Sequence, residues 1–162
     1  MQEYEYSFKV KTIIPFIDYC KNNDYDELKI ENQNRIVYEN NNSDDIIARI
    51  TTKIINGKTN IIFDCKNIGK RDNDLKISKE SLPIKITKNN KKQIESLLDV
   101  LDFYEAANNC RTRYVYEKND IKFEIDDYEN PKMKVVAIEG KKETVDKIYS
   151  ELLEKYKKEM EV

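Results

Sequence analysis

The chain has 162 residues, 37% of them charged and 39% hydrophobic, which predicts one polar globular domain spanning residues 1–162. Its net charge of −2 and pI near 5.5 argue against nucleic acid as a partner, because nucleic-acid-binding domains are usually basic. Histidine is absent, so histidine-dependent catalytic triads and histidine metal sites are excluded.

Two further features bear on the location of the protein. The chain has no apolar run long enough for a membrane span and no signal peptide at its start, so no membrane partner is expected. Its three cysteines, Cys20, Cys65 and Cys110, are far apart and form no metal-spaced pair, as in proteins of a reducing compartment. A cytoplasmic location is therefore expected, while the sequence indicates no particular oligomeric state.

The first strand is predicted over Gln2–Val10, where polar and apolar side chains alternate. Its apolar face is formed by Tyr4, Tyr6, Phe8 and Val10. Its polar face is formed by Glu3, Glu5, Ser7 and Lys9. Two carboxylates at i and i+2 lie about 6 to 7 Å apart on a strand, and once enclosed they need cations nearby. Such oxygen pairs suit Mg²⁺ or Mn²⁺, whereas a solvated outer face explains the same alternation without a metal.

The remaining elements follow from the same two periodicities. Helices are predicted where apolar residues recur every three or four positions, at 11–22, 91–104 and 141–160. Strands are predicted at 28–31, 35–39, 45–55, 59–66, 75–78, 82–88, 110–118, 121–128 and 132–139. Residues 32–34 are interpreted as a turn, and 67–74 as a charged loop and candidate flap. Hairpins dominate this order, so an antiparallel sheet is expected.

The polar faces of these strands carry charges of both signs. The charged residues are Glu3, Glu5, Lys9, Arg49, Lys53, Asp64, Lys66, Lys85, Arg111, Arg113, Lys122, Glu124, Asp126 and Glu139. If the sheet curls with its apolar faces outward under the helices, these charges line an interior, and a barrel of about eight strands can enclose one small ligand. Basic groups would bind phosphate oxygens and carboxylates would bind metals. A flat sheet with one face in water explains the alternation equally well, so both arrangements stay open at this point.

Several of these residues carry a resemblance to a known family. The segment from Glu3 through Glu5 to Ser7 resembles the ExExK signature of CYTH domains, also called triphosphate tunnel metalloenzymes. This superfamily includes class four adenylyl cyclases, thiamine triphosphatases and inorganic triphosphatases. Arg49 is similar to the first arginine of the family's R-x-R strand, and Lys66 resembles the lysine of the strand that follows it. Arg111 and Arg113 resemble the basic pair after the middle helix. Residues 125–128 resemble an aspartate-bearing turn strand, and residues 137–140 resemble the closing E-x-E strand.

The chain also departs from the family pattern. Ser7 replaces the signature lysine, Thr51 the second arginine of the R-x-R strand, and Ala137 the first closing glutamate. The usual acidic strand near residues 79–84 is matched only in part, by Lys79 and Glu80. These departures affect the groups that carry the family's activity.

The resemblance implies an α+β fold, an antiparallel β tunnel of about eight strands, closed or partly open, with flanking helices. It implies metal-dependent binding, and in an active member hydrolysis, of a nucleoside triphosphate or inorganic tripolyphosphate, with Mg²⁺ or Mn²⁺. The implied metal ligands are Glu3, Glu5, Asp126 and Glu139. The expected phosphate-binding residues are Arg49, Lys53, Lys66, Lys85, Arg111 and Arg113. The expected catalytic residues are Glu3, Glu5 and Lys9, with Lys9 or Lys53 in place of the missing lysine. The alternative is a catalytically impaired nucleotide-binding, polyphosphate-binding or protein-interaction module on the same fold.

Overall fold

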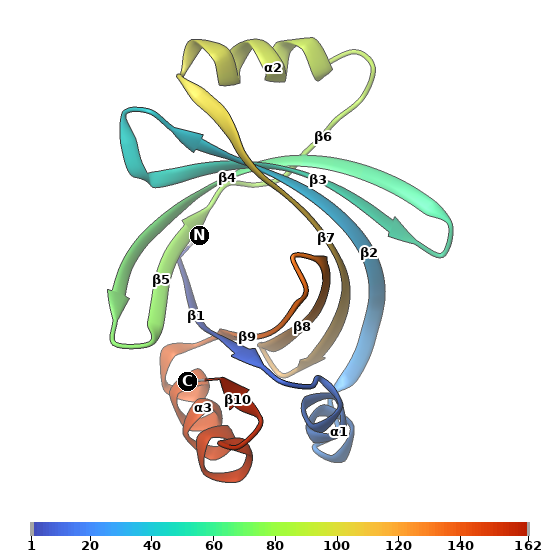
Figure 1. Ribbon diagram of the computed structural model, residues 1–162, viewed down its shortest axis with the longest axis vertical. Coiled ribbons are helices and arrows are strands. Elements are labelled where there is room, and N and C mark those ends of the chain that lie inside the picture. Colours follow the sequence, from blue (N-terminus) through green and yellow to red (C-terminus); the bar gives the residue numbers. More distant parts are fainter. Residues whose placement is uncertain (1, 162) are drawn as a thin grey trace.

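Eight antiparallel strands close into a barrel in the computed structural model of this chain, which describes residues 2–161 (Figure 1). Neighbouring strands follow the order β1, β5, β4, β3, β2, β7, β8 and β9, and β9 pairs with β1. The strands are β1 (Gln2–Val10), β2 (Asp26–Asn40), β3 (Ser43–Ile55), β4 (Lys58–Asp72), β5 (Leu75–Glu80), β7 (Phe103–Lys118), β8 (Ile121–Asn130) and β9 (Met133–Gly140). Two short strands pair outside this circuit, β6 (Ile84–Lys85) with β4 and β10 (Met160–Glu161) with β1. The predicted α+β barrel is confirmed.

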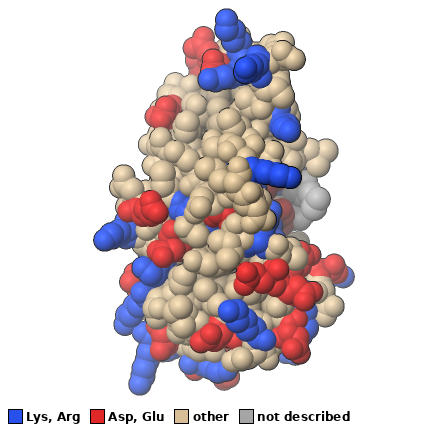
Figure 2. Space-filling view, turned by 90° about the vertical axis from the view of Figure 1, so that its right-hand side faces the viewer, with Lys and Arg blue, Asp and Glu red and all other residues tan. Residues whose placement is uncertain are grey.

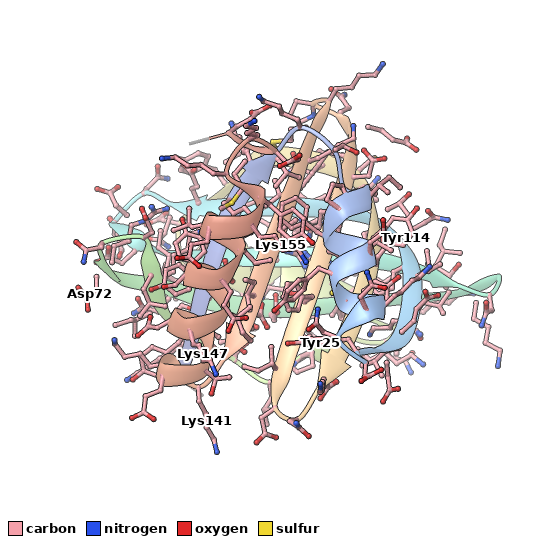
Figure 3. All side chains as sticks on the ribbon, turned by 90° about the horizontal axis from the view of Figure 1, so that it is seen from below. Tyr25, Asp72, Tyr114, Lys141, Lys147 and Lys155 are labelled. Atoms are coloured by element: carbon pink, nitrogen blue, oxygen red, sulfur yellow. The ribbon has the colours of Figure 1, made fainter. Side chains whose placement is uncertain are left out.

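Three helices of the described residues lie outside the barrel. Helices α1 (Ile14–Asn22) and α3 (Lys142–Tyr156) cover β1, β8 and β9, and α2 (Lys91–Val100) covers the opposite side (Figure 1). Viewed from below, α1 and α3 lie side by side across these strands, with Lys147 and Lys155 marking α3 (Figure 3). None of the helices in residues 2–161 combines the length and apolar character needed to cross a bilayer.

The apolar core lies between the barrel wall and these helices, not inside the barrel. Phe123 and Ile125 on β8 point outward and are fully buried against the helices. A smaller core beneath α2 contains Ile94 and Leu98. Because strand side chains alternate, the residues between the outward ones must face the barrel interior. The arrangement with apolar faces outward is thus the observed one, and the flat-sheet alternative is wrong.

Several predicted boundaries are corrected by the pairing of the strands. Residues 32–34 continue β2, because β2 is hydrogen-bonded to β3 on one side and β7 on the other, which outweighs their turn propensity. Residues 67–72 belong to β4 and pair with β5, so they do not form a flap. The middle helix ends at Val100, since Phe103 already starts β7. The last helix ends at Tyr156, and α1 starts at Ile14.

Gly69 marks an irregularity in the pairing of β4 with β5. Its φ of +56° lies in the left-handed region, which glycine adopts readily. A Cβ atom at this position would lie 2.1 Å from the carbonyl oxygen of Ile77. Only glycine therefore allows β4 to approach β5 here, and this contact helps to close the barrel.

Replacing Phe123 with alanine should lower the free energy of unfolding by about 3 to 5 kcal/mol, because a fully buried aromatic ring is removed. The matched control is Leu97→Ala on α2, where the side chain is exposed and the expected loss is below about 1 kcal/mol. Urea denaturation followed by circular dichroism measures both. Equal losses would contradict a core between helices and barrel wall.

Candidate functional site

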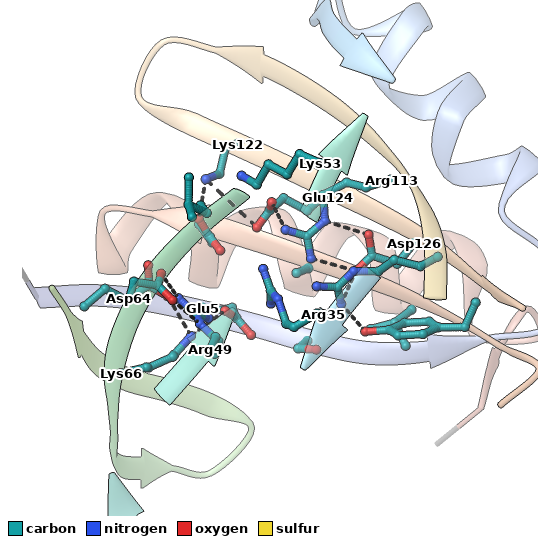
Figure 4. A pocket seen from close by; sticks show the side chains of 18 residues that line it. Glu5, Arg35, Arg49, Lys53, Asp64, Lys66, Arg113, Lys122, Glu124 and Asp126 are labelled. Carbon is teal, nitrogen blue, oxygen red and sulfur yellow. Dashed lines mark hydrogen bonds and ion pairs between the residues drawn. The ribbon is translucent and has the colours of Figure 1, made fainter. Parts of the chain in front are cut away.

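The barrel encloses a charged cavity of about 260 Å³ (Figure 4). Its walls carry the basic residues Arg35, Arg49, Lys53, Lys66, Arg111, Arg113 and Lys122. They carry the acidic residues Glu5, Asp64, Glu80, Glu124, Asp126 and Glu139. Ser7, Ile62, Tyr128, Val135 and Ala137 complete the lining. Seven basic and six acidic groups leave the cavity with a formal surplus of one positive charge.

The first group of charges, the Arg49 cluster, consists of Glu5, Arg49, Asp64, Lys66 and Glu80 on β1, β3, β4 and β5. Arg49 donates from Nε and Nη2 to Asp64 at 2.8 and 2.5 Å, and its Nη2 lies 3.1 Å from Glu80 Oε1. Lys66 Nζ lies 3.2 Å from Glu80 and 3.7 Å from Glu5. Burial alone would lower the pKa of Arg49, but the two carboxylates raise it above its ordinary value. Arg49 is thus held as a cation.

The second group, the Arg113 cluster, consists of Arg111, Arg113, Lys122, Glu124, Asp126 and Glu139 on β7, β8 and β9. Arg113 donates from Nε and Nη2 to Asp126 at 2.7 and 2.8 Å, and it also pairs with Glu124. Asp126 lies directly opposite Arg113 in the strand register and also contacts Arg111 Nη1 at 3.4 Å. On the next strand, Glu139 Oε2 lies 2.9 Å from Lys122 Nζ. The register of neighbouring strands therefore places Arg113 opposite Asp126 and Lys122 opposite Glu139.

Glu139 and Glu124 are adjacent carboxyl groups whose pKa values are shifted in opposite directions, upward for Glu139 and downward for Glu124. Burial and the adjacent Glu124 carboxylate raise the pKa of Glu139 to about 8, while Lys122 opposes this shift. Glu139 therefore keeps its proton near neutral pH, and the two carboxyl groups share a hydrogen bond.

A Glu139→Gln variant should change how stability depends on pH. Glu139 loses its proton near pH 4.5 in the unfolded chain but only near pH 8 in the folded protein. Between these two pH values the folded state binds more protons than the unfolded state, so the stability of the wild type falls as pH rises. Glutamine keeps a neutral polar group and removes this contribution. The Tm difference between variant and wild type, measured from pH 5 to 9, is expected to shift in favour of the variant as pH rises. A difference independent of pH would contradict the raised pKa.

Arg35 lies between the two clusters (Figure 4). Its Nε donates to Thr51 Oγ1 at 3.0 Å, and within residues 2–161 no carboxylate oxygen lies within 4.0 Å of its guanidinium. Burial lowers the pKa of Arg35, and the charges of Arg111, Arg113 and Arg49 lower it further. In addition, Arg111 Nη2 is buried without a hydrogen-bond partner in the described part of the chain. The centre of the cavity thus holds donors and positive charge that lack an anion.

The cavity continues at both ends. At one end an adjoining chamber of about 540 Å³ shares Arg35 and Arg111 and adds the apolar side chains of Val37, Ile47 and Ile68. The chamber also contains the hydroxyl of Ser78, which is buried without a partner within residues 2–161. At the other end a pocket of about 390 Å³ shares Lys122 and Glu139 and is lined by Glu3. An elongated ligand can therefore extend beyond the central cavity.

Most of the residues predicted from the sequence meet in this interior. Those lining the central cavity are Glu5, Arg49, Lys53, Lys66, Arg111, Arg113, Asp126 and Glu139. Glu3 lines only the adjoining pocket. Lys9 has the same strand parity, but it is exposed where β1 pairs with β10, and it does not line the central cavity. Lys85 is exposed on β6, on the outer side of the barrel. The geometry therefore removes Lys9 and Lys85 from the candidate site and leaves Lys53 as the lysine that could replace the one lost at Ser7.

Two cavity residues were missed. Arg35 was hidden because residues 32–34 were interpreted as a turn, whereas continuous alternation along β2 places Arg35 on the interior face. It stands directly opposite Thr51, the position where the family pattern has its second arginine. Glu80, recognised only as a partial match, also lines the cavity. Uninterrupted period-two counting through polar residues is the signal that could have found Arg35.

The predicted metal ligands do not converge on a common point. Asp126 faces Arg111 and Arg113, Glu5 lies with Lys66 and Lys76, and Glu139 lies with Lys122. Within residues 2–161 no group of three His, Cys, Asp or Glu side chains is arranged to hold a metal ion. The carboxylates are placed as partners of resident basic groups, an arrangement that does not fit a site for Mg²⁺ or Mn²⁺.

No protein-family model and no curated protein matches this chain. Among solved structures, the PH1819 protein of Pyrococcus horikoshii OT3 matches with a TM-score of 0.70 and 21% identity, covering 98% of this chain and 93% of that one. HpAC1 of Hippeastrum, described as having a dominant triphosphatase activity, matches with a TM-score of 0.64 and 12% identity, covering 94% and 87%. A chain of the Schizosaccharomyces pombe Mediator head module matches with a TM-score of 0.67 and 12% identity, covering 96% of each. At these identities the likeness shows a shared fold.

Proposed function

We propose that this chain is a divergent member of the CYTH, or triphosphate tunnel, superfamily and binds a triphosphate-containing anion inside its barrel. The observation that carries the proposal is Arg35, a guanidinium without a carboxylate partner among the described residues, placed among three other arginines. A phosphate-rich anion would neutralise this charge and accept a hydrogen bond from the unpartnered Nη2 of Arg111. The triphosphatase activity described for the Hippeastrum protein supports the same class of ligand.

The face of the outer surface drawn in Figure 2 shows no comparable concentration of one charge. On the face drawn in Figure 2, basic and acidic side chains lie interspersed, as expected for a solvated surface. The cavity, in contrast, has a formal surplus of positive charge that could select an anion, and partial burial there strengthens electrostatic contacts. This contrast favours a small ligand held inside the barrel.

Hydrolysis is a separate step from binding. Glu139 is suited to accept a proton from an attacking water in its ionised form, which becomes populated as the pH rises toward its raised pKa of about 8. Arg35, Lys53 and Arg111 would hold phosphate oxygens and stabilise the charge of the transferring group. A Glu139→Gln variant should therefore bind as wild type does and lose any turnover.

Isothermal titration calorimetry with tripolyphosphate and ATP, in buffers with EDTA or with Mg²⁺, tests this proposal, and phosphate release is assayed in the same samples. Binding of either ligand, one per chain, is the expected result. Inorganic sulfate serves as a control for nonspecific anion binding. Absence of binding in every buffer would overturn the proposal, whereas binding without phosphate release would identify a binding module on this fold.

A protein-interaction role is the second candidate, and helix α2 is the feature that favours it. Its residues Leu97 and Val100, followed by Leu101, are each more than half exposed. The Mediator head module, an assembly, contains a chain of the same fold. If no phosphate ligand binds, this helix is the surface to test next.

A further inference from the structure

We infer that the cavity binds its phosphate ligand without a divalent metal ion, because the carboxylates that would otherwise bind the metal form ion pairs with lysine and arginine side chains of the cavity. The inference rests on the proposed function, since it specifies how that ligand is held. It concerns one cation above all, the Lys122 ammonium in the Arg113 cluster.

The first step is the pairing of the cavity carboxylates. All six that line the cavity, Glu5, Asp64, Glu80, Glu124, Asp126 and Glu139, lie within 4.0 Å of a lysine or arginine nitrogen. Two of them, Asp64 and Asp126, are held by two nitrogens of one guanidinium, the geometry that fixes a carboxylate most firmly. A metal ion would have to displace these contacts before it could bind.

The second step is the position of Lys122. Its Nζ lies 2.9 Å from a carboxyl oxygen of Glu139 and 3.9 Å from one of Glu124, so one ammonium contacts two adjacent carboxyl groups. Lys122 stands directly opposite Glu139 on β9, and Glu139 stands directly opposite Glu5 on β1. Lys122 thus lies beside two carboxyl groups on adjacent strands, and a third acidic residue, Glu5, stands opposite one of them.

The third step concerns what surrounds this place. Ser7 and Ala137, both in the cavity lining, stand directly opposite each other on β1 and β9. Neither side chain supplies a carboxylate, so these two positions add no anionic ligand to those already near Lys122. The two departures from the family signature therefore meet in space, and the one at Ala137, which removes a carboxylate, lowers the affinity of this region for a divalent ion.

The consequence is that phosphate charge must be balanced by the chain itself. Arg35, Lys53 and the free nitrogen of Arg111 face the cavity and provide that charge. Removing the Lys122 charge should free Glu139 from its basic partner while Glu124 keeps its contact with Arg113, and a divalent ion that displaces the Glu139 proton can then bind here.

The test compares wild type with Lys122→Gln and with Lys122→Arg, which keeps the positive charge. Binding of Mn²⁺ to the ligand-free proteins is measured by electron paramagnetic resonance, and tripolyphosphate binding is measured calorimetrically in EDTA. Wild type and Lys122→Arg should bind tripolyphosphate in EDTA and bind no Mn²⁺. Lys122→Gln should gain a Mn²⁺ site and lose about tenfold in tripolyphosphate affinity in EDTA. Lys147→Gln, on the exposed face of α3, is the control.

Each outcome bears on a separate claim. Stoichiometric Mn²⁺ binding to ligand-free wild type, or tripolyphosphate binding that requires Mg²⁺, would overturn the inference and leave the proposed function standing. Failure of wild type to bind tripolyphosphate or ATP in any buffer would overturn the proposed function. The Mn²⁺ titration does not depend on a phosphate ligand. If Lys122→Gln does not fold, the measurements on wild type and Lys122→Arg still show whether tripolyphosphate binding requires a metal ion.

Discussion

An Arg35→Met variant is expected to bind tripolyphosphate about 10- to 100-fold more weakly than wild type, the equivalent of ~1.5 to 3 kcal/mol for hydrogen bonds to a charged group. The same substitution should raise the Tm of the ligand-free protein. Both effects have one cause, because the guanidinium lies among Arg49, Arg111 and Arg113 without a carboxylate within 4.0 Å in the described chain. Methionine keeps an unbranched, flexible side chain and removes the charged guanidinium.

The sign of the stability effect follows from the pKa of Arg35. Burial and the neighbouring arginines lower it below the ordinary value of 12.5, so folding is opposed whenever the group is charged, including at neutral pH. An anionic ligand offsets this repulsion, so wild type should gain more in Tm from tripolyphosphate than the variant does. Thermal denaturation with and without tripolyphosphate measures the gain in Tm for wild type and variant, and Lys147→Met, at an exposed position, is the control. A lower Tm for the ligand-free variant would contradict an unbalanced charge at Arg35.

The Asp126→Asn variant should lose about 3 to 5 kcal/mol of unfolding free energy, the usual cost of removing one partner from a buried ion pair. Asp126 is only 3% exposed and accepts hydrogen bonds from both Arg111 and Arg113. Asparagine keeps the shape but leaves two buried guanidinium groups with less negative charge. Urea denaturation at low ionic strength gives the loss directly.

The next residue on the strand provides a matched control. Asp127 points to the outer side of β8, with its side chain 43% exposed and 3.5 Å from Lys134. Exposed ion pairs of this kind contribute little, so Asp127→Asn should change stability by less than about 1 kcal/mol. Addition of tripolyphosphate should restore part of the stability lost by Asp126→Asn, since the ligand supplies negative charge near Arg111. Equal losses from the two variants would refute the distinction between inner and outer faces.

Alternation along the strands was enough to predict many of the interior residues. Glu5 on β1, Arg49 on β3 and Glu124 on β8 were assigned to polar faces from period two alone, and all three line the cavity. The outward core followed from the same counting, because Phe123 and Ile125 occupy the alternate positions. The resemblance to CYTH domains supported the closed form of the sheet, which local patterns left open.

What the sequence by itself determined, then, was which face of each strand is polar; how far that face reaches and which charges meet were decided by the tertiary structure. Lys9 has the correct parity, yet it lies where β1 pairs with β10, away from the cavity. Arg35 was concealed by turn-forming residues that β3 and β7 hold in a strand. The pairing of Lys122 with Glu139 depends on the register of β8 and β9, and that of Glu139 with Glu5 depends on closure by β1. These pairings arise from hydrogen bonds between strands far apart in the chain, which local periodicity does not encode.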